Sequence, residues 1–173
     1  MAKAKAKGGA IELGPDSDPN ILHKNYVKEC KAIGIEPYGP LKDALTNEEN
    51  PNRGKQIIVF PPSTEGEAVL GPGGCRALVN AMIGKSNDSS QIPFTATKEI
   101  RVCRSNIKDG GAAAIGSLLS ATANKMSIDS TDPSAAQPQW KLEYMELMDN
   151  NIGRDGALAL GRSLCVGTNR TFS

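Results

Sequence analysis

Gly84-Lys85-Ser86 is the segment of this 173-residue chain that most suggests chemistry, because it matches the end of a phosphate-binding loop. That loop also needs a glycine five residues before Gly84, and Val79 stands there. The segment follows a predicted helix, whereas a phosphate-binding loop lies between a strand and the start of a helix. We therefore predict no nucleotide site at Gly84.

Histidine and cysteine chemistry is equally poorly supported. His23 is the only histidine, so neither a Ser-His-Asp set nor a histidine metal site is expected. Cys30, Cys75, Cys103 and Cys165 lie far apart and form no Cys-x-x-Cys pair, which predicts reduced thiols. The sequence thus predicts a protein that is not an enzyme and that has no catalytic residue, cofactor, metal or small-molecule substrate.

Charge and hydropathy exclude two further classes. The 20 Lys and Arg nearly balance the 19 Asp and Glu, whereas proteins that bind nucleic acid or membrane surfaces usually carry a basic excess. No apolar stretch approaches the length of a membrane span, and the basic residues 1–9 precede no apolar run of a secretory signal. We expect a cytoplasmic protein that binds neither nucleic acid nor membranes.

The N-terminal third predicts a tail followed by two helices. Residues 1–18 are rich in Lys, Gly, Pro and Asp, which predicts a disordered basic tail. From Asn20, apolar residues recur at three- and four-residue intervals up to Gly34, and a second short helix follows around Leu41 and Leu45. We assign residues 19–54 to a helical region. Gln56 to Phe60 then has the β-branched composition of a strand.

The remainder of the chain contains an internal repeat. Residues 70–78, 107–115 and 152–160 align, each with a further apolar residue four positions on. The second and third copies also share a longer preceding pattern, Ile100-x-Val102-x-x-Ser105-x-Ile107 and Met145-x-Leu147-x-x-Asn150-x-Ile152. Gly71-Pro72-Gly73-Gly74 belongs to the first copy and needs no nucleotide to explain it.

Each copy has the chemistry of a strand, a turn and a helix. Alternate apolar residues such as Ile100 and Val102 face inward from a short strand. Ser105 and Asn150 stand where the chain leaves the strand, and their side chains can bond backbone groups that the turn leaves unpaired. Glycines at 111 and 156 allow strand and helix backbones to approach. Stacked copies therefore form a parallel sheet with helices over one face.

The third copy, Leu142 to Leu160, resembles the ribonuclease-inhibitor type of leucine-rich repeat almost throughout, and the resemblance covers residues 55–173. It implies an α/β solenoid with parallel strands on the concave face, helices on the convex face and an N-terminal helical cap. Residues 26–37 resemble the helical segment that precedes the repeats in some leucine-rich-repeat proteins of cilia, flagella and centrosomes. The implied role is a non-catalytic scaffold or adaptor in the cytoskeleton, such as a ciliary or flagellar axoneme.

The spacing departs from that family. Gly74 to Gly111 is 37 residues and Gly111 to Gly156 is 45, whereas such repeats usually take about 20–29. The excess lies in predicted surface loops at 86–93 and 123–139, and a further insertion at 61–69 separates the first predicted strand from Leu70. No polar capping unit follows the third copy, so we expect an open C-terminal side. Either a protein partner covers that side or the sequence is a piece of a longer protein.

Outward-facing residues around the strands are the expected contact site. If Ile100 and Val102 face inward, protein contacts fall to Arg101, Cys103, Glu146 and Met148. A regulator of a small GTPase, like the activators of Ran, is the first alternative. Its arginine would be Arg104 or Arg154. A recognition module of innate-immune type is the second alternative, and it predicts a nucleotide-binding domain elsewhere in a longer chain.

Overall fold

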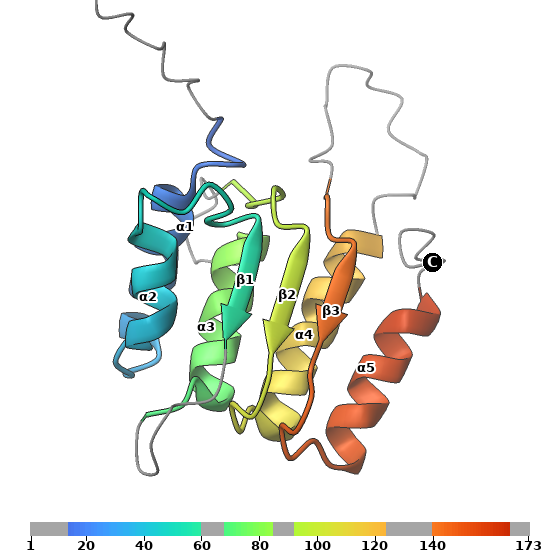
Figure 1. Cartoon of the computed structure of the whole chain (residues 1–173). Helices are drawn as coiled ribbons and strands as arrows, with labels where there is room; N and C mark the ends of the chain where they lie inside the picture. The colour runs from blue at the N-terminus through green and yellow to red at the C-terminus, as the bar shows by residue number, and fades with distance from the viewer. Residues whose placement is uncertain (1–13, 60–67, 85–91, 124–139, 167–173) are drawn as a thin grey trace, which may run out of the picture.

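The computed structural model describes residues 14–59, 68–84, 92–123 and 140–166, and Figure 1 shows the order of its elements. Most of the predicted loops at 61–69, 86–93 and 123–139 and most of the predicted tail lie outside these residues. The elements are α1 (Pro19–Ala32), α2 (Gly39–Thr46), β1 (Gln56–Val59), α3 (Gly71–Ile83), β2 (Glu99–Val102), α4 (Lys108–Ala123), β3 (Tyr144–Glu146) and α5 (Arg154–Val166).

The three strands form one parallel sheet in the order β1-β2-β3. Ile57, Ile100 and Met145 are in register across the sheet, and Val59 pairs with Val102. The β1 and β2 members of this ladder are buried, as the alternating apolar pattern predicted. Leu147 packs against the same core but lies just after β3.

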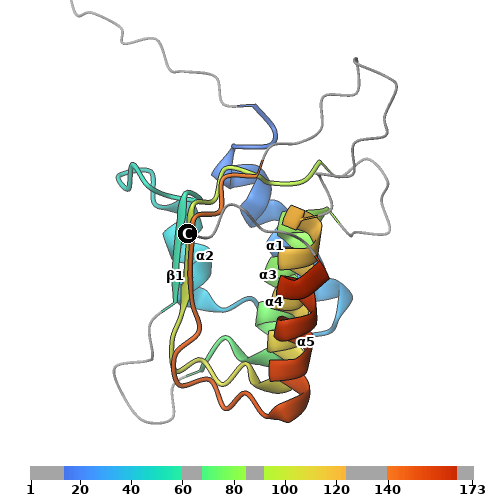
Figure 2. The ribbon, with the colours of Figure 1, turned by 90° about the vertical axis from the view of Figure 1, so that its right-hand side faces the viewer.

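Helices α3, α4 and α5 lie side by side over one face of the sheet, and Figure 2 shows this two-layer arrangement edge-on. We call β1 with α3 the first unit, β2 with α4 the second unit and β3 with α5 the third unit. The predicted strand-turn-helix order and the parallel pairing of the strands are confirmed. The chain therefore has a mixed α/β fold with a small parallel sheet.

The two N-terminal helices flank the first unit. Helix α1 packs against α3, and α2 packs against β1. The predicted helical stripe is confirmed, because Leu22, Tyr26 and Cys30 are all buried. The described end of the predicted tail, residues 14–18, contacts the rest of the fold: the Asp16 carbonyl accepts a 2.9 Å hydrogen bond from the Thr95 amide. The Asp18 carboxylate caps α1 by accepting from the Asn20 amide at 2.9 Å.

Asn150 joins the second and third units where the chain leaves the sheet. Its side-chain Oδ1 accepts from the Ser105 amide at 2.9 Å, and its Nδ2 donates to the Val102 carbonyl. The Asn150 carbonyl also accepts from the Lys108 amide at 3.0 Å. These bonds satisfy backbone groups of the turn, as we predicted, but they do so across units, so they also fix the spacing between them.

The glycines at the helix starts allow a close approach between units as well as the one expected within each unit. A Cβ on Gly156 would lie 2.9 Å from the Asp109 Cα, and a Cβ on Gly111 would lie 3.3 Å from the Cys75 Cβ. Asp109 and Cys75 belong to the helices of the preceding units. Within their own units, a Cβ on Gly111 would lie 2.5 Å from the Ile107 Cβ, and a Cβ on Gly156 would lie 2.8 Å from the Ile152 Cγ2. Glycine is thus needed for close approach within each unit, as expected, and also between neighbouring helix starts, which the pattern within a single copy could not reveal.

Candidate protein-binding surface

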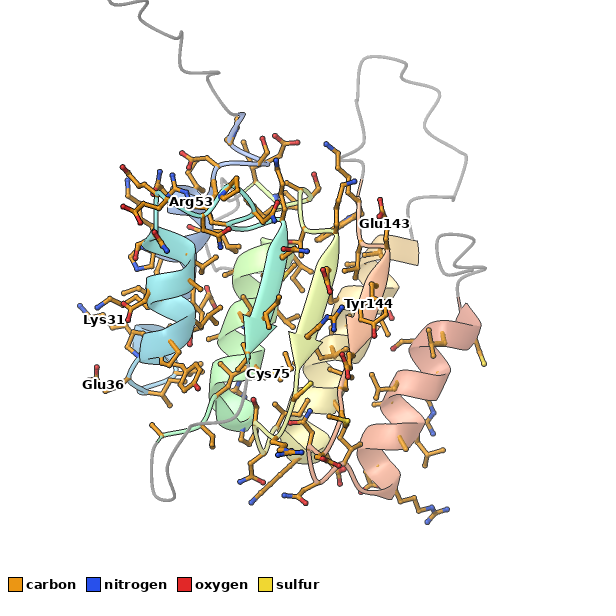
Figure 3. The ribbon with its side chains drawn as sticks, viewed as in Figure 1. Lys31, Glu36, Arg53, Cys75, Glu143 and Tyr144 are labelled. Atoms are coloured by element: carbon orange, nitrogen blue, oxygen red, sulfur yellow. The ribbon has the colours of Figure 1, made fainter. Side chains whose placement is uncertain are left out.

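The sheet has a second face, opposite the helices, and we call it the open face. Alternation along the strands places every other residue on it. Figure 3 looks onto this face and labels Tyr144 on β3. The residues that alternate with the inward-facing ladder are Gln56, Ile58, Glu99, Arg101, Tyr144 and Glu146. No described helix covers this face, so its side chains meet solvent.

Arg101 connects the charged residues of the open face. Its guanidinium pairs with Glu99 on the same strand and lies 3.6 Å from a Glu146 carboxylate oxygen on β3. It also stacks over the Tyr144 ring, 4.9 Å from the ring centre. On the β1 side, Gln56 donates to Glu99 at 2.6 Å. One polar network therefore crosses all three strands.

This network contributes little to folding stability. The Arg101 side chain is 41% exposed, and exposed ion pairs add little to stability because solvent screens them. The bond to Glu99 raises the pKa of Arg101 above its ordinary value, so the guanidinium stays charged. The open face thus presents a fixed cation between two carboxylates, beside a half-exposed aromatic ring. Arg and Tyr are enriched where proteins meet.

Three of the four predicted contact residues are accessible. Arg101 and Glu146 lie together on the open face, and Met148 is 49% exposed just after β3. Cys103 is a correction, because it is only 5% exposed. The Cys103 amide donates to the Val59 carbonyl, and the next amide, Arg104, donates to the Met148 carbonyl. The backbone at this point therefore bonds to both neighbouring units, and strand alternation alone did not anticipate that Cys103 is buried.

An apolar groove lies on the uncovered side of the third unit, and we call it the edge groove. It has a volume of about 400 Å³ and is lined by Leu119, Met145, Leu147, Leu160 and Leu164. Sequence reasoning predicted an open C-terminal side but named none of these residues as a site. The available signal was the repeat itself, because Leu160 and Leu164 align with Ile115 and Leu119, which are buried.

The two arginines of the GTPase alternative lie in different units. Arg104 follows β2 and pairs with Asp149 at 3.3 Å, whereas Arg154 is the exposed first residue of α5. Arg104 is therefore already held by a carboxylate of this chain. Both arginines lie at the edge of the sheet where the strands end, but they share no hydrogen-bond or ion-pair partner among the described residues.

The described residues contain no cluster of side chains suited to hold a metal ion, and His23 is the only histidine. Burial and the nearby charges of Lys42 and Lys24 lower the pKa of His23, which favours its neutral form. Among the residues the structure describes, no three His, Cys, Asp or Glu side chains gather closely enough to hold a metal ion. Gly84 ends α3 in a left-handed conformation, so Gly84-Lys85-Ser86 begins at a helix C-terminus, as the sequence predicted.

A scan against protein-family models and a search of curated proteins both found no match to this chain. None of the described helices combines the length and apolar character required to cross a bilayer.

Proposed function

We propose that this protein is a leucine-rich-repeat solenoid of the ribonuclease-inhibitor type, and that it acts as a non-catalytic scaffold that binds another protein through its open face. The sequence pattern carries the repeat assignment. The parallel ladder, the helices over one face and the Asn150 bonds between units support it, because each is what stacked repeats of this type require. In such a solenoid the open face is the concave one.

The uncovered face of the parallel sheet is the observation that carries this function. Parallel sheets are almost always covered on both faces, and here no described helix covers one of them. The Arg101 network on that face adds little stability, so stability alone does not explain it. A fixed guanidinium between Glu99 and Glu146, next to Tyr144, suits the polar and aromatic contacts of a protein interface.

The setting we propose is a cytoskeletal assembly in the cytoplasm, such as a ciliary or flagellar axoneme. The resemblance of residues 26–37 to the segment that precedes the repeats in ciliary proteins is the support for this setting. In such an assembly, a scaffold needs a rigid surface more than it needs a reactive group.

Site-specific photo-crosslinking in native cells tests the open face. A benzophenone amino acid replaces Tyr144, and a matched variant carries it at Arg76, which is exposed on α3 in the helix layer. We expect a discrete protein adduct from position 144 and none from position 76. Reversing the central charge with Arg101→Glu should remove the adduct while leaving the far-ultraviolet circular dichroism spectrum unchanged.

Adducts from position 76 but not from position 144 would contradict binding through the open face. The GTPase alternative makes a different prediction with the same material. If the adduct is a small GTPase whose hydrolysis rate rises with this protein and falls back with Arg104→Ala or Arg154→Ala, the protein is a regulator and not a scaffold.

A further inference from the structure

The same helical stripe recurs on α3, α4 and α5 and faces the next unit. On α4 it consists of Ala112, Ile115, Gly116 and Leu119, spaced as one face of a helix. The equivalent residues are Cys75, Leu78, Val79 and Met82 on α3, and Ala157, Leu160, Gly161 and Leu164 on α5. All eight residues of the α3 and α4 stripes are buried, whereas none of the four on α5 is.

Gly116 lies where the buried stripe of α4 contacts the next helix, α5. A Cβ on Gly116 would lie 2.8 Å from the Ser163 Oγ and 3.2 Å from the Ala159 carbonyl oxygen, both on α5. Ala159 and Ser163 are small residues four positions apart, so they form a shallow face that passes over a residue without a side chain. The α4–α5 contact therefore needs glycine on one helix and two small residues on the other.

Gly161 occupies the same place on α5, and no described helix covers it. A Cβ on Gly161 meets no described atom within 4 Å. Leu160 is only partly buried and Leu164 is 50% exposed, and both line the edge groove. The helix surface that receives α5 in the second unit is thus reproduced on the third unit without an occupant among the described residues.

The backbone of the third unit repeats this arrangement. In the second unit the Ser105 amide and the Val102 carbonyl bond to the Asn150 side chain of the following unit. The corresponding groups of the third unit are the Asn150 amide and the Leu147 carbonyl, and neither bonds to any residue within the described ranges. β3 is the edge strand of the described sheet. The third unit therefore presents the same apolar and hydrogen-bonding groups that the second unit uses to bind the unit that follows it.

We propose that the edge groove and the free edge of β3 dock a strand-turn-helix unit of a partner protein. Its strand adds parallel to β3, and its helix crosses Gly161 with two small residues four positions apart. An Asn after its strand bonds the Asn150 amide and the Leu147 carbonyl. Continuity with the interface between the second and third units carries this choice, because every group described on the third unit has a bonded or buried counterpart one unit earlier.

A second copy of this chain does not fit that description. The other edge of the sheet is flanked, since α2 packs against β1 and α1 packs against α3. That end cannot add parallel to β3 without displacing both helices. Two third units meeting about a two-fold axis would pair their strands antiparallel, which the Asn150-type bonds between parallel strands do not match.

A peptide of residues 140–166 is the probe, because this segment already packs by its Ala159 and Ser163 side onto the equivalent surface of the second unit. It is titrated into the full chain, labelled with nitrogen-15, and amide shifts are followed by NMR. We expect saturable shifts at Leu147, Gly161 and Leu164 but not in α1 or α2. Gly161→Leu in the full chain should weaken binding by at least about tenfold, since the new side chain fills the crossing point.

Gly161→Leu is informative because no atom of the described chain lies where its side chain begins, so the fold should tolerate it. Leu158→Ala is the matched control, since Leu158 is exposed on α5 but does not line the groove, and it should leave binding unchanged. A peptide with Ala159→Leu and Ser163→Leu should not bind.

The absence of shifts at the edge groove, or shifts that Gly161→Leu leaves unaltered, would overturn the proposal. So would a dimer of the chain alone that sedimentation equilibrium detects and Gly161→Leu abolishes, because the occupant would then be a second copy. Since the open face is a different surface, the crosslinking result at Tyr144 decides the scaffold function independently.

Discussion

The second and third units have nearly the same sequence pattern but different surroundings. Ile115 in the second unit is completely buried, whereas its counterpart Leu160 is only partly buried. A Cβ on Gly116 would contact the next helix, whereas a Cβ on Gly161 would have no described atom within 4 Å. The comparison shows that in a stack of similar units, the place in the stack decides whether an apolar side chain belongs to the core or to a surface.

The largest expected difference between the two units is in the stability lost when the central aliphatic residue of each helix is truncated. Ile115→Ala removes a fully buried side chain, and we expect the free energy of unfolding to fall by about 3 kcal/mol. Leu160→Ala should cost about 1 kcal/mol, because its side chain is partly solvated in the folded protein. Urea unfolding followed by circular dichroism measures both, and equal losses would mean that α5 is covered as fully as α4.

The Asn150 bonds should give the next largest effect. Asn150→Ala leaves the buried Ser105 amide and Val102 carbonyl without their partners, at an expected cost of about 2 kcal/mol in the free energy of unfolding. Ser105 is the matched position one unit earlier, and its hydroxyl bonds only the Cys103 carbonyl of its own unit. Ser105→Ala should therefore cost about 1 kcal/mol. A smaller loss for Asn150→Ala than for Ser105→Ala would show that side-chain bonds between units are not what joins them.

Adding one methyl group at the two glycines should produce effects of opposite sign. Gly116→Ala pushes against the Ala159 carbonyl and should lower the free energy of unfolding by about 1 kcal/mol after its gain in helix propensity. Gly161→Ala keeps that gain without a clash and should raise stability by up to about 1 kcal/mol. Thermal unfolding midpoints of the pair, measured side by side, test the sign, and a loss in both would place a neighbour over Gly161 in the isolated chain.

The smallest expected change concerns Lys108, which begins α4 with a φ of 53°, where the first unit has Gly71 with a φ of 64°. Lys108→Gly removes the steric cost of this left-handed conformation and should stabilise the fold by about 0.5–1 kcal/mol. Lys108→Ala keeps a Cβ and is the control, so it should bring no such gain. If both variants lose stability to the same extent, the lysine side chain itself matters and the strain does not.

Much of the fold could be predicted because short-range patterns carry it. Alternate apolar residues at Ile100 and Val102 required a strand with one buried face, and the stripe of Leu22, Tyr26 and Cys30 required a helix. Asn150 was recognised as a residue of the turn from its place after the strand. The bonds that Asn150 makes to the preceding unit were not predicted, because a turn pattern does not show which unit supplies the backbone amide that bonds to the side chain.

The candidate sites were predicted less well. Arg101 and Glu146 were placed correctly on the open face because strand alternation alone decides the face. Cys103 was misplaced, since it is buried although strand alternation puts it on the open face. The edge groove was missed as a set of residues, because Leu160 and Leu164 have the same types and spacing as side chains that are buried one unit earlier.

The sequence by itself thus determined the repeated strand-turn-helix unit, its inward and outward faces and the parallel order of the strands. These follow from residue types at fixed short spacings, and local geometry is enough to interpret them. Only the tertiary structure decided which described unit has an exposed apolar side, which backbone groups of the third unit have no partner among the described residues, and that Cys103 is buried. Exposure depends on neighbours distant in the chain, and a local pattern contains no information about them.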